Sequence, residues 1–205
     1  MKADTAWGLL GGTFDPIHTG HLEFARVAAD TLKLDRVVFV PAAQNPLKTN
    51  AAGASAEQRL AMVQLALEEF GDARFIVDRF EIDRPGPSYT IATLEALRTH
   101  YGPRCVLLMG SEVFAHLTKW KNPARLLELA QIAVITRPEE KPVNVAAVLG
   151  QLTSARQTQG VRVLPLSTPA VSATHIRTAI GTDRQTQPLG LQRTVWQFIR
   201  KNRLY

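Results

Sequence analysis

A pair of adjacent glycines and two histidines lie near the start of the chain, in the string GGTFDPIHTGH at residues 11–21. Gly11 and Gly12 allow backbone N–H groups to approach phosphate oxygens closely. A helix that begins just after them offers unpaired N–H donors and a favourable dipole to an anion. Because His18 and His21 are three residues apart, both rings fall on one side of the first helical turn. The string therefore predicts a polyphosphate site.

Other readings of the same string are available. The Walker phosphate loop is absent, because no Gly-Lys-Ser/Thr follows a glycine run, and the three spaced glycines of a dinucleotide fingerprint are absent too. Asp15 and the two histidines could bind a metal, but no third ligand stands at a recognisable spacing. Each residue taken singly fits an ordinary turn or a structural histidine, so the prediction depends on the whole string.

A second group of phosphate-binding residue types lies near the other end of the chain, in VSATHIR at residues 171–177. Ser172 and Thr174 at a helix start can cap the helix and also donate to phosphate. Arg177, one turn further in, can reach the same oxygens. Alone, this segment fits an ordinary capped helix with a surface arginine; together with the N-terminal string it favours a shared site.

These residues must be positioned by alternating strands and helices. Short runs rich in Val, Ile, Leu and Phe predict strands at 7–12, 36–41, 74–82, 105–110, 131–136 and 161–166. Strands that alternate with helices predict an α/β fold: a doubly wound, mostly parallel sheet with helices on both faces. In such a sheet, ligands bind beyond the carboxyl ends of the strands, which is where residues 11–21 fall.

Helical periodicity appears between several of these strands. One apolar face contains Leu22, Ala25, Ala29 and Leu32, another Leu94, Leu97 and Tyr101, and a final helix Val195, Phe198 and Ile199. Asn122-Pro123 predicts a capped helix start, continuing through Leu126, Leu127 and Ala130. Residues 41–55 and 137–144 are rich in turn formers and predict surface loops.

Length and composition limit the classes of protein to which the chain can belong. Its 205 residues suit one domain, and 45% apolar with 20% charged residues is ordinary for a globular protein. No apolar run approaches the ~20 residues that span a bilayer, and the N-terminus does not resemble a signal peptide. We therefore expect a cytoplasmic protein that does not bind membranes. Cys105, the only cysteine, is expected to be a buried structural thiol.

The net charge of +6 comes entirely from the last quarter of the chain. Residues 1–153 contain 16 Lys/Arg and 17 Asp/Glu, whereas residues 154–205 contain 8 Lys/Arg and only Asp183. A basic end can attract nucleic acid or a phosphorylated small molecule. Because no basic run and no interleaved aromatic residues mark a nucleic-acid surface, we expect no nucleic-acid partner.

The string GGTFDPIHTGHL resembles the signature of the nucleotidyltransferase superfamily, most closely that of bacterial nicotinate-nucleotide adenylyltransferases. Further strings resemble the same family along nearly the whole chain: VPAAQNPLK, GPSYTIATLEAL, GSEVFAHLTKW, ITRP, VSATHIR and VWQFIRKNRLY. Class I aminoacyl-tRNA synthetases have a related His-x-Gly-His turn, but they are far longer and need a lysine-rich loop that is missing here.

The resemblance implies a Rossmann-like nucleotidyltransferase domain over residues 1–205, with the helical segment at about 172–205 packed on it. It implies adenylyl transfer from ATP to nicotinate mononucleotide in NAD biosynthesis. Mg²⁺ would be carried by the ATP phosphates, with no metal site built by the protein. His18, His21 and Arg177 are the expected catalytic residues. The expected ATP contacts are these three with Gly11, Gly12, Thr13, Phe14, Gly110, Glu112, Ser172 and Thr174.

The resemblance also implies a site for the acceptor. Tyr89 and Thr90 at a helix start would hold the nicotinate carboxylate. Trp120 offers a face for stacking on the ring, although it also fits a core position. The backbone around Lys121 would help to bind the carboxylate. Two further cations, Lys48 and Arg137, are expected to bind the acceptor phosphate or to close a loop over the substrate.

Two residues depart from the family pattern. Leu47 stands where the family loop usually has a histidine, and Glu112 stands where it usually has an aspartate. These departures keep open a nucleotide-binding module without catalysis. A nicotinamide rather than nicotinate acceptor also remains an alternative, and pantetheine-phosphate and cytidylyl transferases share the first string. Closure of the loop at residues 44–53 and a homo-oligomeric state stay open.

Overall fold

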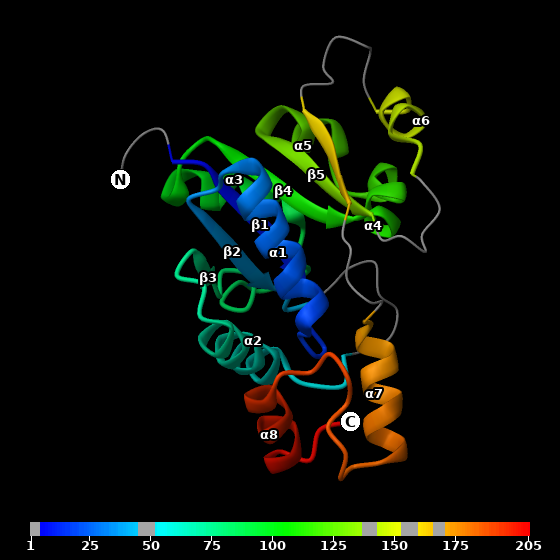
Figure 1. The fold of residues 1–205 in the computed structure, drawn as a ribbon. Helices are drawn as coiled ribbons and strands as arrows, with labels where there is room; N and C mark the ends of the chain where they lie inside the picture. The colour runs from blue at the N-terminus through cyan, green and yellow to red at the C-terminus, as the bar shows by residue number, and fades with distance from the viewer. Residues whose placement is uncertain (1–4, 45–51, 137–142, 153–159, 166–170) are drawn as a thin grey trace.

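The computed structural model describes residues 5–44, 52–136, 143–152, 160–165 and 171–205. Within these ranges one six-stranded sheet has the order β3-β2-β1-β4-β5-β6, and every strand pairing is parallel (Figure 1). The strands are β1 Trp7–Gly12, β2 Arg36–Pro41, β3 Phe75–Val77, β4 Cys105–Gly110, β5 Ala130–Thr136 and β6 Val161–Pro165. The predicted doubly wound parallel sheet is confirmed.

Helices connect the strands and follow the last one. They are α1 Thr19–Leu32, α2 Ala56–Phe70, α3 Thr90–Tyr101, α4 Ser111–Ala115, the 3₁₀ turn η1 Leu117–Lys119, α5 Pro123–Leu129, α6 Val145–Gly150, α7 Ala173–Thr182 and α8 Arg193–Lys201. Among the described helices, none is long and apolar enough to cross a membrane.

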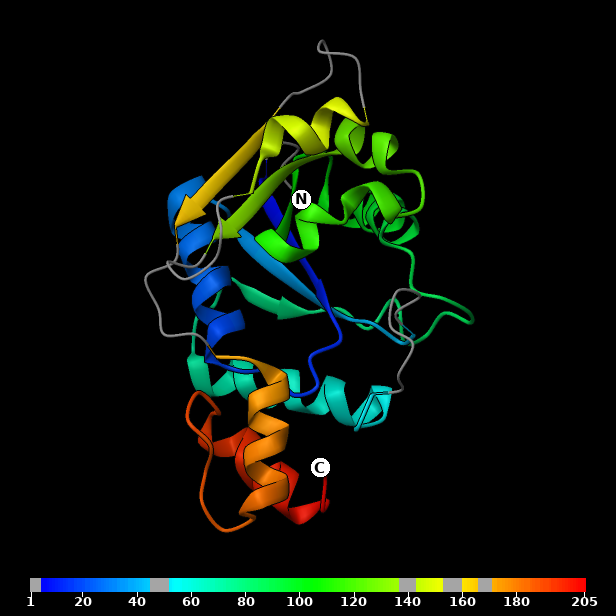
Figure 2. The same cartoon turned by 90° about the vertical axis from the view of Figure 1, so that its right-hand side faces the viewer.

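Side chains alternate across the sheet and build a core on each face. Leu10 of β1 packs in a cluster with α1, α2 and α8, whereas Leu9 packs in a second cluster with α3, α4 and α5. Figure 2 shows helices on both sides of the twisted sheet. A parallel sheet covered on both faces has strands that are apolar on both faces. Cys105 lies in the second cluster, where burial raises the pKa of its thiol, as expected of a structural cysteine.

Three details differ from the sequence prediction. The third strand ends at Val77, because Asp78 accepts a hydrogen bond from the Phe80 amide and the chain turns there. Ala130 begins β5 and pairs with Cys105, so it does not continue α5. Pro123 does occupy the first turn of α5, but Asn122 makes no side-chain cap hydrogen bond. Sheet pairing overrides the helical propensity of Ala130. The backbone conformation before Pro123 overrides the capping propensity of Asn122.

The central strands separate at their carboxyl ends. β1 pairs with β4 only as far as Leu9 and Leu107, yet β1 stays paired with β2 to Gly12 and β4 with β5 to Gly110. Between β1 and β4 the strand order also reverses, because the chain moves outward in both directions from this point. This is the position at which open α/β sheets bind their ligands.

The C-terminal segment packs against the rest of the chain through α8. The backbone amides of Arg193 and Thr194, at the start of α8, both donate to the carboxylate of Glu69 on α2. Val195 and Ile199 are buried in the cluster that also contains α2. The helix start predicted around Ser172 is confirmed as α7, which lies beside α8 at the lower end of the molecule in Figure 1.

Candidate active site

The histidine pair lies where β1 runs into α1. His18 is the N-cap residue of α1 and is 4% exposed, and its ring stacks on that of His21 with 3.8 Å between centroids. The backbone amide of His18 donates to Nδ1 of His21 at 3.3 Å. Because Nδ1 accepts this bond, the proton of a neutral His21 ring is on Nε2, which can donate to an anion.

The residues between the glycines and the histidines form the rest of this turn. Gly11 is exposed at the end of β1, and a Cβ there would meet nothing within 4 Å. The Thr13 hydroxyl is buried and has no hydrogen-bond partner among the described residues. Phe14 has φ = 50° and its ring packs edge-on against His21, 5.1 Å between centroids. The buried Phe14 ring therefore supports His21 from the core side.

The helix start predicted for the outer phosphates has the expected cap. The Ser172 hydroxyl accepts from the His175 amide at 3.2 Å, which leaves the hydroxyl proton available. Arg177 donates to the Thr174 hydroxyl at 3.3 Å. The Arg177 side chain is 35% exposed, so part of the guanidinium remains accessible to a ligand.

The two predicted phosphate-binding segments are in direct contact, although they lie at opposite ends of the sequence. Arg177 donates through Nη1 to the backbone carbonyl of Asp15 at 2.7 Å. A Cβ on Gly20 would come within 3.7 Å of the Val171 carbonyl, just before α7. The structure therefore brings His18, His21 and Arg177 to one place beside the separated ends of β1 and β4.

A buried arginine that the sequence analysis did not identify holds this turn in place. Arg59 of α2 is 2% exposed and donates to four backbone carbonyls, those of Thr13 at 2.7 Å, Ala42 at 2.7 Å, Ala54 at 3.2 Å and Ala43 at 3.3 Å. Burial lowers the pKa of Arg59, and the nearby Asp15 charge opposes that shift. Arg59 thus joins the loops after β1 and β2.

Gly110 and Glu112 occupy the end of β4 and the first turn of α4. Gly110 is the N-cap residue of this short helix and Glu112 is exposed. Both therefore lie on the β4 side of the point where the strands separate, opposite the histidine turn. The longer reach of a glutamate is accommodated because the side chain projects into solvent.

Three of the residues expected to bind the acceptor, Tyr89, Thr90 and Lys121, lie together at the start of α3. Tyr89 is the N-cap residue and makes no side-chain cap hydrogen bond, and Thr90 is the first residue of the helix. The Lys121 ammonium lies 4.3 Å from the centroid of the Tyr89 ring. Trp120 is partly buried against the apolar cluster that Leu9 forms with α3, α4 and α5. A helix N-terminus with a neighbouring cation is a suitable environment for a carboxylate.

A second network missed by the sequence analysis supports this helix start. Glu81 is buried and accepts from the Thr93 hydroxyl at 2.6 Å, and it also interacts with the Ser88 side chain. The Ser88 hydroxyl accepts from the Ala43 and Gln44 amides at 3.1 and 3.4 Å. The Pro-Ser-Tyr-Thr string pointed to this segment, but nothing in the sequence indicated that Glu81 is its buried partner.

Leu47, Lys48 and Arg137 lie outside the described residues, as does most of the loop at 44–53.

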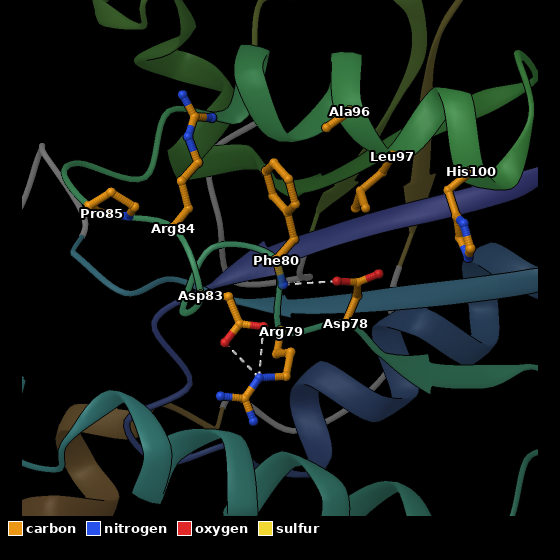
Figure 3. A pocket seen from close by; sticks show the side chains of 9 residues that line it. All are labelled: Asp78, Arg79, Phe80, Asp83, Arg84, Pro85, Ala96, Leu97 and His100. Atoms are coloured by element: carbon orange, nitrogen blue, oxygen red, sulfur yellow. Dashed lines mark hydrogen bonds and ion pairs between the residues drawn. The ribbon is translucent and has the colours of Figure 1, made fainter.

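A cavity of about 500 Å³ lies between the turn after β3 and helix α3 (Figure 3). Phe80 and Leu97 line its apolar part, and Arg79 binds Asp83 at 2.8 Å on its other side. None of the predicted site residues within the described ranges lines it. We therefore place the candidate active site at the gap between β1 and β4, beside the histidine turn.

Comparisons with known proteins agree with this geometry. The cytidylyltransferase-like family model matches residues 9–179. A Chromobacterium violaceum protein named "Probable nicotinate-nucleotide adenylyltransferase" is 39% identical over 97% of both chains. A Neisseria meningitidis protein of the same name is 41% identical, also over 97% of both chains. The chain belongs to the nicotinate-nucleotide adenylyltransferase family.

Solved structures agree on the fold of this adenylyltransferase family member. The Plasmodium falciparum nicotinic acid mononucleotide adenylyltransferase complexed with NaAD has a TM-score of 0.73, covering 97% of this chain and 96% of that one. The same protein complexed with APC has a TM-score of 0.70 with the same coverage. At 12% identity these two structures show a shared fold.

Proposed function

We propose that this chain transfers the adenylyl group of ATP to nicotinate mononucleotide, which yields nicotinate adenine dinucleotide and pyrophosphate. The observation that carries the proposal is the hydrogen bond from Arg177 to the Asp15 carbonyl, which joins the two phosphate-binding segments into one site. Relatives that match over nearly the whole chain have the name of this activity.

The chemistry is an attack by the 5′-phosphate oxygen of the acceptor on the α-phosphorus of ATP. The new P–O bond forms as the bond from the α-phosphorus to the bridging oxygen breaks, and pyrophosphate leaves. The attacking oxygen is already ionised at neutral pH, so the reaction needs no general base. The site then has to align the two substrates and neutralise charge that develops on the phosphates.

We assign roles to the protein groups on this basis. His18 and His21 would donate to the α- and β-phosphates, and Arg177 with the start of α7 would bind the outer phosphates. Mg²⁺ would enter on the ATP phosphates with its waters. Among the described residues, no group of three or more His, Cys, Asp or Glu side chains could hold a metal ion.

The choice of acceptor would be made at the start of α3. The nicotinate carboxylate would accept from the first backbone amides of the helix, beside the Lys121 ammonium, with Trp120 against the ring. Nicotinamide has no charge, so it would gain less from the helix dipole and from Lys121. We therefore expect nicotinate mononucleotide to be preferred.

The test is pyrophosphate release with Mg·ATP, comparing nicotinate with nicotinamide mononucleotide as acceptor. A strong preference for nicotinate supports both the reaction and the carboxylate site. Equal use of both acceptors would keep the reaction and remove the carboxylate site, and no turnover with either would overturn the proposal. Lys121→Met should reduce the preference, whereas Lys119→Met, which removes an exposed lysine of η1, should leave it unchanged.

Several expectations from the sequence stay predictions. These are the cytoplasmic location, the absence of a nucleic-acid partner, the oligomeric state, and the arrangement of the whole chain as a single domain.

A further inference from the structure

Asp15 has a buried carboxylate that the proposed chemistry does not use. It lies between the glycines and His18, and it is almost completely buried. Its two oxygens accept from the Gly53 amide at 2.8 Å, the Ala54 amide at 3.1 Å and the Tyr205 hydroxyl at 2.6 Å. A carboxylate with three donors is well compensated for the loss of water.

Tyr205 is held against this carboxylate from several sides. A Cβ on Gly53 would lie 2.8 Å from its ring, so the ring packs directly on the backbone at that residue. Arg184 donates to the Tyr205 carbonyl. Burial and the Asp15 charge both raise the pKa of the phenol, so at neutral pH Tyr205 is a neutral hydrogen-bond donor.

The same residue, Asp15, also positions Arg177. The Asp15 carbonyl accepts from Nη1 of Arg177 at 2.7 Å, and the carboxylate is 4.0 Å from the same nitrogen. The carboxylate thus competes with ATP for the guanidinium. Hydrogen bonds from Tyr205, Gly53 and Ala54 reduce that competition, because each of them stabilises the negative charge.

We propose that Tyr205 is a positioning residue for ATP, which engages the Asp15 carboxylate so that Arg177 remains available to the outer phosphates. The proposal rests on the proposed function, in which Arg177 binds those phosphates. Without the phenol, Asp15 keeps its two amide donors but attracts Arg177 more strongly. The consequence is weaker binding of ATP with little change at the acceptor site, which lies at the start of α3.

The test compares Tyr205→Phe with Tyr101→Phe as a matched control. Tyr101 also donates its phenol to a carboxylate, that of Asp78 at 2.9 Å, but on the far part of α3. For Tyr205→Phe we expect the KM and the calorimetric Kd for Mg·ATP to rise about tenfold, within the range for loss of a hydrogen bond to a charged group. The KM for nicotinate mononucleotide should stay within about twofold. Tyr101→Phe should change neither constant.

A second arm asks whether Tyr205 acts through Arg177. In an Arg177→Ala background, Tyr205→Phe should no longer change the Kd for Mg·ATP, since residues in one network are not additive. An undiminished effect in that background would overturn the proposal. Equal increases in the KM of both substrates would also overturn it, because they would indicate a structural defect.

These experiments distinguish a failure of the role proposed for Tyr205 from a failure of the proposed function. If the wild-type protein binds Mg·ATP but turns over neither acceptor, the reaction is wrong, and the Kd comparison still decides the role of Tyr205. If turnover is normal and Tyr205→Phe behaves like Tyr101→Phe, only the role of Tyr205 is wrong. A wild-type protein that does not bind Mg·ATP would overturn both.

Discussion

The hydrogen bond from the His18 amide to Nδ1 of His21 decides which ring nitrogen can contact a ligand. Because it leaves Nε2 as the donor, His21 can stabilise a phosphate without being charged. His21→Ala should therefore lower kcat by about 10²–10³-fold, the usual cost of removing one preorganised donor to developing negative charge. Steady-state pyrophosphate release measures it. His21 suits this test better than the buried His18, whose ring also packs on Gly20.

The control for this substitution is His100→Ala. His100 is exposed in the last turn of α3, with its ring against Tyr101 and away from the histidine turn. Its removal should leave kcat unchanged within about twofold. A thermal unfolding curve for His21→Ala close to that of the wild type assigns the lost turnover to chemistry. Near-normal kcat for His21→Ala would remove the role that we give to this residue.

Glu81 should make the stability of the folded protein depend on pH, and the burial of its carboxyl group sets the sign of that dependence. Burial raises the pKa of this carboxyl, and its hydrogen bonds with Thr93 and Ser88 oppose the shift only in part. A raised pKa in the folded state means that the stability contribution is present at acidic pH and is lost as the pH rises through the folded pKa. Glu81→Gln should thus gain in melting temperature relative to the wild type as the pH rises above the ordinary carboxyl pKa of 4.5. A difference that stays constant or falls with pH would contradict this.

At the scale of elements, α2 organises the loops around the site through Arg59. Arg59→Lys keeps a charge but cannot reach four carbonyls with one ammonium group. Because each buried acceptor left without a partner costs about 1–3 kcal/mol, we expect the free energy of unfolding to fall by at least about 2 kcal/mol. Urea unfolding measures this value. Arg125→Lys, on an exposed ion pair with Glu128, should change it by less than about 0.5 kcal/mol.

The elements differ in how far the sequence predicts them. The string at 11–21 predicts both its strand-to-helix turn and its histidine pair, because glycine freedom and helical spacing are local properties. Helix α2 was not anticipated, although Ser55 and Gln58 form a capping box that is visible in the sequence. The role of Arg59, in contrast, cannot be predicted from local sequence. Its partners at Thr13 and Ala42 are distant in the chain, so only the fold reveals them.

At the scale of the molecule, sheet topology explains why residues so far apart share one site. α1, α3, α4 and α7 all begin beyond the carboxyl ends of the strands, so their N-termini gather at one edge of the sheet. Several helix starts at one edge favour a substrate pair with many negative charges. The basic last quarter of the chain also favours anionic substrates, since it brings the positive charge of Arg177 to that edge.

This arrangement predicts how the whole protein responds to its substrate. Mg·ATP at about 100 times its Kd should stabilise the native state by about 2.7 kcal/mol, which raises the melting temperature by roughly 5–10 °C for a chain of this size. Mg²⁺ alone should cause no shift if, as proposed, the ion enters on the ATP phosphates with its waters. EDTA should leave the free protein unchanged and reduce the shift caused by ATP. A shift with Mg²⁺ in the absence of ATP would instead require a metal site built by the protein itself, and differential scanning fluorimetry distinguishes the two cases directly.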